Sequence, residues 1–150
     1  MEIVTIKRKP RKSIKRTFKK KKRVSRTNLV AKLDAAVSLW VRTKYADENG
    51  MVKCYTCPKT LPIAKMQNGH YVSRAVRSTR WNEENMRPQC FGCNIMQGGQ
   101  PITFRENLVK ELGETMVLFV EELRHTLFKP TDAWLLQQIQ EYGDKLLRLR

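Results

Sequence analysis

The sequence predicts an α+β protein in which helical segments enclose a middle segment of short strands and loops. On both sides of this middle segment, apolar residues recur every three or four positions, the period of an amphipathic helix. Residues 51–100 lack that period and contain three prolines and several glycines, which favours strands and loops over a long helix. A chain of 150 residues has the size of one domain with a modest core, so we expect a single domain over residues 27–150.

The first 26 residues form a basic arm. They hold 13 of the 30 lysines and arginines and one of the 14 acidic residues, and the remaining chain has a net charge of only +4. Such a segment buries too little apolar surface to order by itself, so we expect the arm to be disordered without a partner. A basic arm binds polyanions by counterion release, which favours nucleic acid over a solubilising or host-targeting tail. The arm residues expected to contact nucleic acid are Lys20, Lys21, Lys22 and Arg23.

A first helix is predicted within residues 27–48. Thr27 and Asn28 offer an N-cap, and Asn49-Gly50 is a turn signal at the other end. Its apolar stripe, which is most simply core packing, comprises Leu29, Leu33, Val37, Trp40 and Val41.

The C-terminal helices are predicted within residues 101–150. Thr103 and Glu106 have the spacing of a capping box, Gly113 is a weak point inside the helix that follows, and Thr131 begins a last helix after Pro130. The last helix carries a seam for another helix, either in this chain or in a second copy. Its residues are Leu135, Ile139, Tyr142, Leu146 and Leu149.

Two C-x-x-C pairs, 32 residues apart, provide four thiolates for one tetrahedral metal ion. They are Cys54, Cys57, Cys90 and Cys93. A structural zinc is favoured over two disulfides, unpaired thiols or an iron–sulfur cluster, because nothing in the sequence indicates secretion. Four cysteine ligands close the coordination shell, so this zinc would hold structure and leave the chemistry to other residues.

His70 is the candidate general base inside the segment that the cysteines enclose. It follows Gly69, precedes a probable strand at Tyr71-Val72, and has arginines nearby. An imidazole can take a proton from water that attacks a phosphodiester, and a magnesium ion usually stabilises the charge that develops. The side-chain carbonyl of Asn94 is a suitable hard oxygen ligand for that ion.

These motifs together resemble the NinG/Rap family of phage recombination endonucleases, which belong to the His-Me finger (HNH, ββα-metal) nucleases. The matching stretch covers about residues 54–99 and comprises Cys54-Tyr-Thr-Cys57, Gly69-His70-Tyr71, Arg80-Trp81-Asn82-Glu83-Glu84-Asn85 and Gln89-Cys90-Phe-Gly-Cys93-Asn94. A four-cysteine zinc site followed directly by asparagine is also similar to the phage resolvase endonuclease VII.

The resemblance implies a zinc-stabilised ββα-metal core flanked by helices, with a role for each matching residue. His70 would be the general base at the end of the first strand. Asn85 would brace the loop that carries the histidine, and Asn94 would bind catalytic Mg²⁺ or Mn²⁺ in place of a third-position histidine. The four cysteines match the zinc ligands.

The second ligand of the catalytic metal departs from the pattern. Many HNH nucleases have an acidic residue directly before the base, where this chain has Gly69, and some related sequences have an aspartate at the position of Gln67. Glu83, Glu84 and the Gln67 amide are the candidates, with Glu84 slightly favoured because it adjoins Asn85.

Arginines between residues 74 and 87 suit phosphate contacts that position a nucleic acid without reading its bases. They are Arg74, Arg77, Arg80 and Arg87. Trp81 could stack on an unpaired base or pack within the hairpin, and His125 is expected to interact with a helix C-terminus.

The resemblance therefore predicts a Mg²⁺- or Mn²⁺-dependent DNA endonuclease for branched recombination intermediates such as Holliday junctions. Paired cuts would favour a homodimer through the C-terminal helices. The alternatives are a noncatalytic zinc module that binds nucleic acid, a sequence-specific homing or restriction-type HNH nuclease, and a structural phage or ribosome-associated factor.

The longest apolar run, Met116 to Val120, is far short of the roughly 20 residues of a membrane helix. We therefore expect no membrane partner and a cytoplasmic location, as for a phage or prophage protein in a bacterial host.

Overall fold

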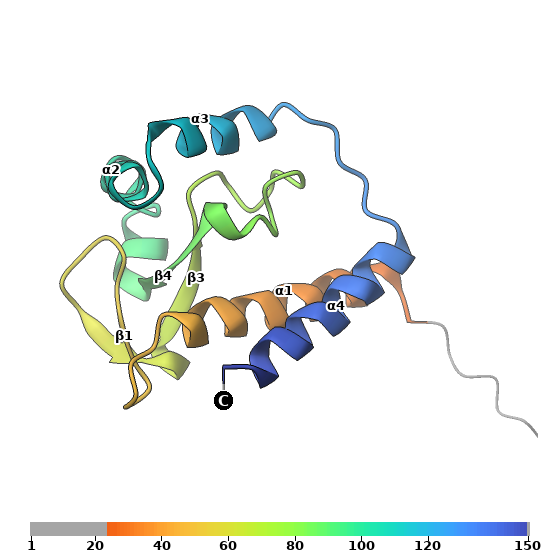
Figure 1. Ribbon diagram of the computed structural model, residues 1–150, viewed down its shortest axis with the longest axis horizontal. Helices are drawn as coiled ribbons and strands as arrows, with labels where there is room; N and C mark the ends of the chain where they lie inside the picture. The colour runs from red at the N-terminus through yellow and green to blue at the C-terminus, as the bar shows by residue number, and fades with distance from the viewer. Residues whose placement is uncertain (1–23, 150) are drawn as a thin grey trace, which may run out of the picture.

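The computed structural model describes residues 24–149 of the chain. Two antiparallel pairs of short strands lie among four α-helices, which confirms a mixed α+β fold. A long helix pair, α1 and α4, lies on one side of the β3–β4 hairpin, and α2 and α3 lie on the other side (Figure 1). The arm residues Lys20, Lys21, Lys22 and Arg23 are outside the described range.

Helix α1 (Arg26–Lys44) begins slightly earlier than the sequence predicts. Ser25 is the N-cap, and its hydroxyl accepts a hydrogen bond from the backbone N–H of Asn28 at 3.3 Å. The five stripe residues predicted for this helix are all buried. Gly50, with φ 70°, makes the turn into the first strand, as its pairing with Asn49 in the sequence predicts.

The strands form two hairpins. Strands β1 (Met51–Lys53) and β2 (Thr60–Pro62) pair around the first cysteine pair, and η1 (Ile63–Lys65) leads into the second hairpin. There, β3 (Met66–His70) pairs antiparallel with β4 (Met86–Cys90), so that His70 lies opposite Met86. Strand β3 ends at His70, so the expected strand at Tyr71-Val72 is wrong; those residues begin the long connection to β4.

A π-helical turn, η3 (Gly92–Met96), follows β4 and carries Asn94. Helix α2 (Pro101–Leu112) begins with proline at its first position, so the predicted capping box at Thr103 is wrong. Gly113 adopts φ 84°, a conformation that favours glycine, and separates α2 from α3 (Glu114–Leu123). Gly113, expected as a weak point inside one helix, therefore separates two helices.

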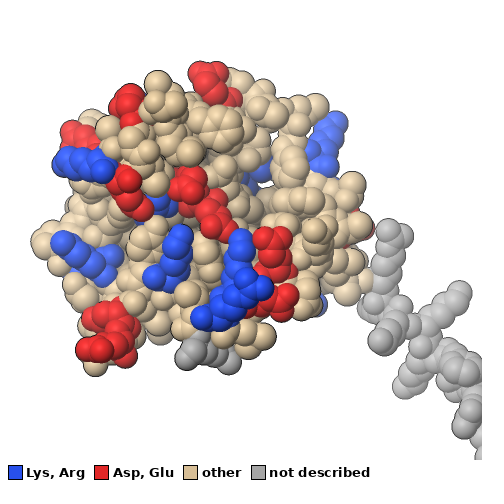
Figure 2. Space-filling model, viewed as in Figure 1, with Lys and Arg blue, Asp and Glu red and all other residues tan. Residues whose placement is uncertain are grey.

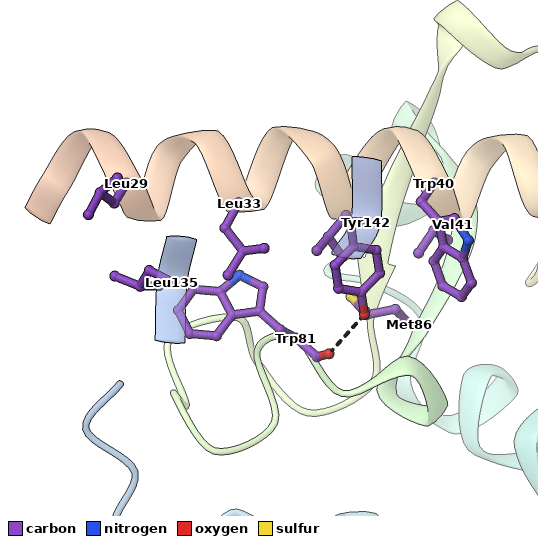
Figure 3. Close-up of a cluster of buried hydrophobic side chains, with 9 residues drawn as sticks. Leu29, Leu33, Trp40, Val41, Trp81, Met86, Leu135 and Tyr142 are labelled. Carbon is purple, nitrogen blue, oxygen red and sulfur yellow. Dashed lines mark hydrogen bonds between the residues drawn. The ribbon is translucent and has the colours of Figure 1, made fainter. Parts of the chain in front are cut away.

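Helix α4 (Asp132–Leu147) begins at the predicted cap, where the Thr131 hydroxyl accepts from the N–H of Trp134 at 3.1 Å. Leu135 and Tyr142 are buried in the main core with the stripe of α1 (Figure 3). Ile139 and Leu146 pack against this core. The seam is thus covered within the chain. Leu149, its last expected member, is 43% exposed.

The same core settles the position of Trp81. Its indole lies between α1 and α4 and is 8% exposed, and its carbonyl accepts a hydrogen bond from the Tyr142 hydroxyl at 3.5 Å (Figure 3). The packing alternative for Trp81 is therefore confirmed.

Charges of both signs are interspersed on the face shown in Figure 2. On this face, the described part of the chain has no patch in which one sign of charge is as concentrated as the lysines and arginines are in the sequence of the arm. Within residues 24–149, every helix is too short or too polar to cross a membrane.

Candidate active site

The four cysteines converge where the first hairpin meets β4. All their sulfur atoms lie within 4.8 Å of one another, and Cys57 Sγ is 3.8 Å from Cys90 Sγ. Zinc–sulfur bonds of about 2.3 Å in a tetrahedron place neighbouring sulfurs about 3.8 Å apart, whereas a disulfide needs about 2.05 Å. All four thiols are free. The geometry therefore fits one tetrahedral ion and no disulfide.

The electrostatics of the thiols also fit a bound cation. Burial raises the pKa of Cys54, but hydrogen bonds from the backbone N–H groups of Cys90 and Thr56 outweigh it and lower this pKa to about 7. Burial and the neighbouring sulfurs raise the pKa of Cys57 to about 12. A bound divalent cation would favour the thiolate form of every cysteine, including Cys57 with its raised pKa, because a coordinated thiol loses its proton. The donor set is consistent with a structural zinc.

A cleft of about 450 Å³ lies between α1, β3 and the π-helical turn. His70 lines it from the end of β3, and Asn94 lines it from the turn directly after the last cysteine. The cysteine cluster fixes the start of that turn, because Cys93 precedes Asn94. Two of the three predicted catalytic residues therefore share one cavity.

The His70 ring is held by a hydrogen bond to the loop that follows it. Its Nε2 atom is 3.0 Å from the carbonyl oxygen of Arg80. A carbonyl can only accept, so Nε2 carries the proton and Nδ1 keeps its lone pair. Burial lowers the pKa of His70 more than the carbonyls of Arg80 and Asn68 raise it, and the Arg74 charge lowers it further. The ring is therefore a neutral base near pH 7.

Asn85 holds the loop that follows His70. The side chain is fully buried, and its Oδ1 accepts from the Val72 N–H at 2.7 Å. Its Nδ2 donates to the carbonyls of Val72 and Thr79, both at 3.0 Å. Asn85 thus occupies the bracing position that the resemblance implies, behind the cleft and not in it.

The cleft also contains oxygen donors suited to a hard cation. Asn94 Nδ2 donates to Gln67 Oε1 at 2.7 Å, which leaves the Asn94 carbonyl oxygen free for a ligand. Asn68 Oδ1 is buried and has no hydrogen-bond partner among the described residues. Asn94, Gln67 and Asn68 all line the cleft. Amide oxygens are hard donors of the class that Mg²⁺ and Mn²⁺ accept.

The structure explains why glycine precedes the histidine. A Cβ atom at position 69 would lie 2.3 Å from Gln89 Oε1, so no side chain fits there without displacing Gln89. An acidic ligand directly before His70 would therefore require the buried Gln89 side chain to move.

Neither candidate glutamate lines the cleft. Glu84 is 3.6 Å from the Arg87 guanidinium, and Glu83 accepts from Lys145 Nζ at 2.6 Å. Both carboxylates therefore lie outside the cleft, and of the three candidates for the second metal ligand only Gln67 lines it with Asn94.

The predicted DNA-binding arginines differ in environment. Arg74 and Arg80 line the cleft, and Arg77 is exposed with no ion pair among the described residues. Arg87 is only 2% exposed and is paired with Glu111 at 2.9 Å. A side chain this buried cannot contact a phosphate. The ion pair of Arg87 with Glu111 instead connects β4 to α2, contrary to the role predicted for Arg87.

Sequence reasoning missed Asp34, the one acidic side chain among the described residues that line the cleft. It lies on α1, outside every motif, and its place beside the stripe residue Leu33 gives no sign of its neighbours. His125, by contrast, lies in the exposed turn after α3, away from the cleft.

The fold and site define a class: a small α+β protein in which a four-cysteine metal cluster supports a cleft containing histidine and asparagine. The chain belongs to the NinG family, because the family model described as Bacteriophage Lambda NinG protein matches residues 4–150.

Curated relatives agree with this assignment. Protein ninG of Escherichia phage lambda is 28% identical over 130 residues, which cover 83% of this chain and 59% of that protein. Protein ninG of Salmonella phage P22 is 27% identical over 132 residues, with the same coverage. That of Escherichia phage 933W is 28% identical over 97 residues, 64% of this chain and 46% of that protein. The chain thus spans 59% of the length of the lambda and P22 proteins and 46% of the 933W protein, and no solved structure matches it.

Proposed function

We propose that this protein is a metal-dependent DNA endonuclease of the His-Me finger type. The observation that carries the proposal is the shared cleft, in which a neutral His70 imidazole and the Asn94 amide face one cavity. The β3–β4 hairpin followed by the turn that carries Asn94 supports a ββα-metal reading of this segment.

In the proposed reaction, His70 Nδ1 removes a proton from water as that water attacks phosphorus. The Arg80 carbonyl keeps the proton on Nε2 and so keeps Nδ1 available. Asn94 would hold a Mg²⁺ or Mn²⁺ ion, which supplies charge stabilisation at the phosphate and the leaving 3′-oxygen. Arg74, whose side chain is 60% exposed, would place the DNA backbone in the cleft.

We propose branched recombination intermediates, including Holliday junctions, as the substrate class. This follows the family resemblance together with the basic arm, which would add affinity for any DNA shape. A homodimer would allow paired cuts. Because α4 uses its seam within the chain, a second copy would have to use other exposed apolar residues of the C-terminal helices, such as Leu118, Phe119 and Leu136.

The test compares cutting of a synthetic four-way junction, a flap, linear duplex and single strand, with and without Mg²⁺. Wild type should cut the branched substrates only with the metal. His70→Ala should lose cutting by about 10²-fold or more and retain DNA binding. The chain has two histidines, so His125→Ala is the matched control and should cut normally.

The same experiment separates the rival functions. Binding without cutting under all metal conditions would identify a noncatalytic nucleic-acid-binding module. Cutting of linear duplex at one sequence, with no preference for branches, would identify a homing or restriction-type nuclease. A protein that neither binds nor cuts any of these substrates would be a structural phage or ribosome-associated factor.

A further inference from the structure

We propose that Asp34, on α1, is a positioning residue that holds the loop of residues 74–81 so that the Arg80 carbonyl fixes the His70 ring. The proposal deepens, and rests on, the proposed nuclease function. Asp34 belongs to no motif of the sequence and is separated from His70 by most of α1 and both strands of the first hairpin.

The Asp34 carboxylate receives four hydrogen bonds from this loop. Oδ1 accepts from Arg80 Nε and Trp81 Nε1, both at 2.9 Å. Oδ2 accepts from Arg80 Nη2 at 2.5 Å and from Arg74 Nη2 at 2.7 Å. Each oxygen thus has two donors, and the pairing with Arg80 is a two-bonded fork of fixed geometry. A carboxylate so occupied is neither a free base nor a free metal ligand.

The Arg80 carbonyl lies between two anchored residues. On one side, the Thr79 carbonyl accepts from the buried Asn85 side chain. On the other side, the Trp81 ring donates to Asp34 and its carbonyl accepts from Tyr142. Arg80 Nη1 also donates to the Arg74 carbonyl at 3.3 Å, which closes the loop on itself. Asn85 therefore holds this loop from the hairpin side, and Asp34 holds it from α1.

The charge of Asp34 makes this role separable from DNA binding. A carboxylate in a cleft that receives phosphate opposes binding through like-charge repulsion. Burial raises its pKa, but the hydrogen bonds from Arg80, Arg74 and Trp81 outweigh burial and keep the group ionised at neutral pH. Removing the charge should therefore strengthen or preserve DNA binding, whereas losing the anchor should slow the reaction.

The decisive variant is Asp34→Asn, which keeps the shape and replaces one acceptor oxygen by a donor NH₂ group. We expect the rate of cutting of bound junction DNA to fall about 10²-fold, the penalty typical of a small displacement of a reacting group. The dissociation constant for the same DNA should stay equal or decrease. Asp144→Asn removes the same charge from an exposed position on α4 and should leave both quantities unchanged.

A second readout follows the ring itself and needs no activity. With His125→Gln as background, His70 is the one histidine left, and imidazole ¹⁵N NMR reports its tautomer. Wild type should show the Nε2–H form, and Asp34→Asn should show a mixture of both tautomers. An unchanged tautomer together with an unchanged cutting rate would overturn the proposal, as would a parallel loss of rate and DNA affinity.

Two further outcomes keep the test decisive. If the wild type cuts no DNA but the tautomer shifts in Asp34→Asn, the anchor is supported and the proposed nuclease function is overturned. If Asp34→Asn does not fold, Arg80→Lys breaks the same fork from the loop side while keeping its charge. In that variant a slowed rate with a mixed tautomer supports the proposal, and normal values of both refute it.

Discussion

Replacing Asn85 by alanine should destabilise the protein more than any other single amide substitution around the cleft. The side chain is fully buried, and its three hydrogen bonds, at 2.7, 3.0 and 3.0 Å, all go to backbone groups of residues 72 and 79. A buried backbone group that loses its partner costs about 1–3 kcal/mol, so three such groups amount to about 3–5 kcal/mol even if the loop relaxes in part. That is a large share of the roughly 5–15 kcal/mol that stabilises a typical domain.

Urea unfolding of the zinc-loaded protein measures this loss. Trp40, Trp81 and Trp134 all lie in or against the main core, so tryptophan fluorescence reports its unfolding. Asn82→Ala is the matched control: its partly exposed side chain makes one capping bond, to the Glu84 N–H at 2.9 Å, worth about 1 kcal/mol. An Asn85→Ala protein within about 1 kcal/mol of wild type, with an unchanged denaturant slope, would refute the idea that this amide holds the loop.

Three further predictions concern the metal, the base and the glycine before it. The purified protein should contain about one zinc per chain, and a chelator should remove it and unfold the β1–β2 hairpin, seen as loss of near-ultraviolet circular dichroism; full native signal after complete metal removal would contradict the cluster's structural role. Because the pKa of His70 is lowered, mainly by burial, the cutting rate should rise with pH through a midpoint below the ordinary value of about 6.5 and be level above it; a midpoint above 7 would exclude this environment. Gly69→Ala should cost about 1–3 kcal/mol in urea unfolding, because the added Cβ meets the Gln89 side chain, while Gly98→Ala, with no atom within 4 Å, reports backbone strain alone.

Much of the local structure could be predicted from the sequence. The apolar period of α1 predicted its buried face, and the two C-x-x-C pairs predicted a four-sulfur cluster, because both signals depend on neighbours a few residues apart. The position of His70 at the end of a strand also agrees with the resemblance. Such patterns reflect local geometry, which a sequence records directly.

Features that depend on distant contacts could not be predicted. Glu84 is next to Asn85 in the sequence, yet its carboxylate lies near Arg87 and does not line the cleft. The neighbouring arginines in the sequence predict a phosphate contact for Arg87, but its side chain is buried and forms an ion pair with Glu111 from α2. Asp34 reaches the cleft only because α1 packs along β3. Gly113 needed its backbone angle before it could be recognised as a boundary between two helices.

The sulfurs of the cysteine cluster are also part of the protein's interior. Cys54, Cys90 and Cys93 are buried in one apolar cluster with Val52 and Met66. An oxidant that converts these thiolates to sulfinic acids would remove metal ligands and introduce polar oxygens into packed space in the same event. Redox damage at this position should therefore inactivate the molecule in a single step, and the cleft beside it would be lost together with the metal.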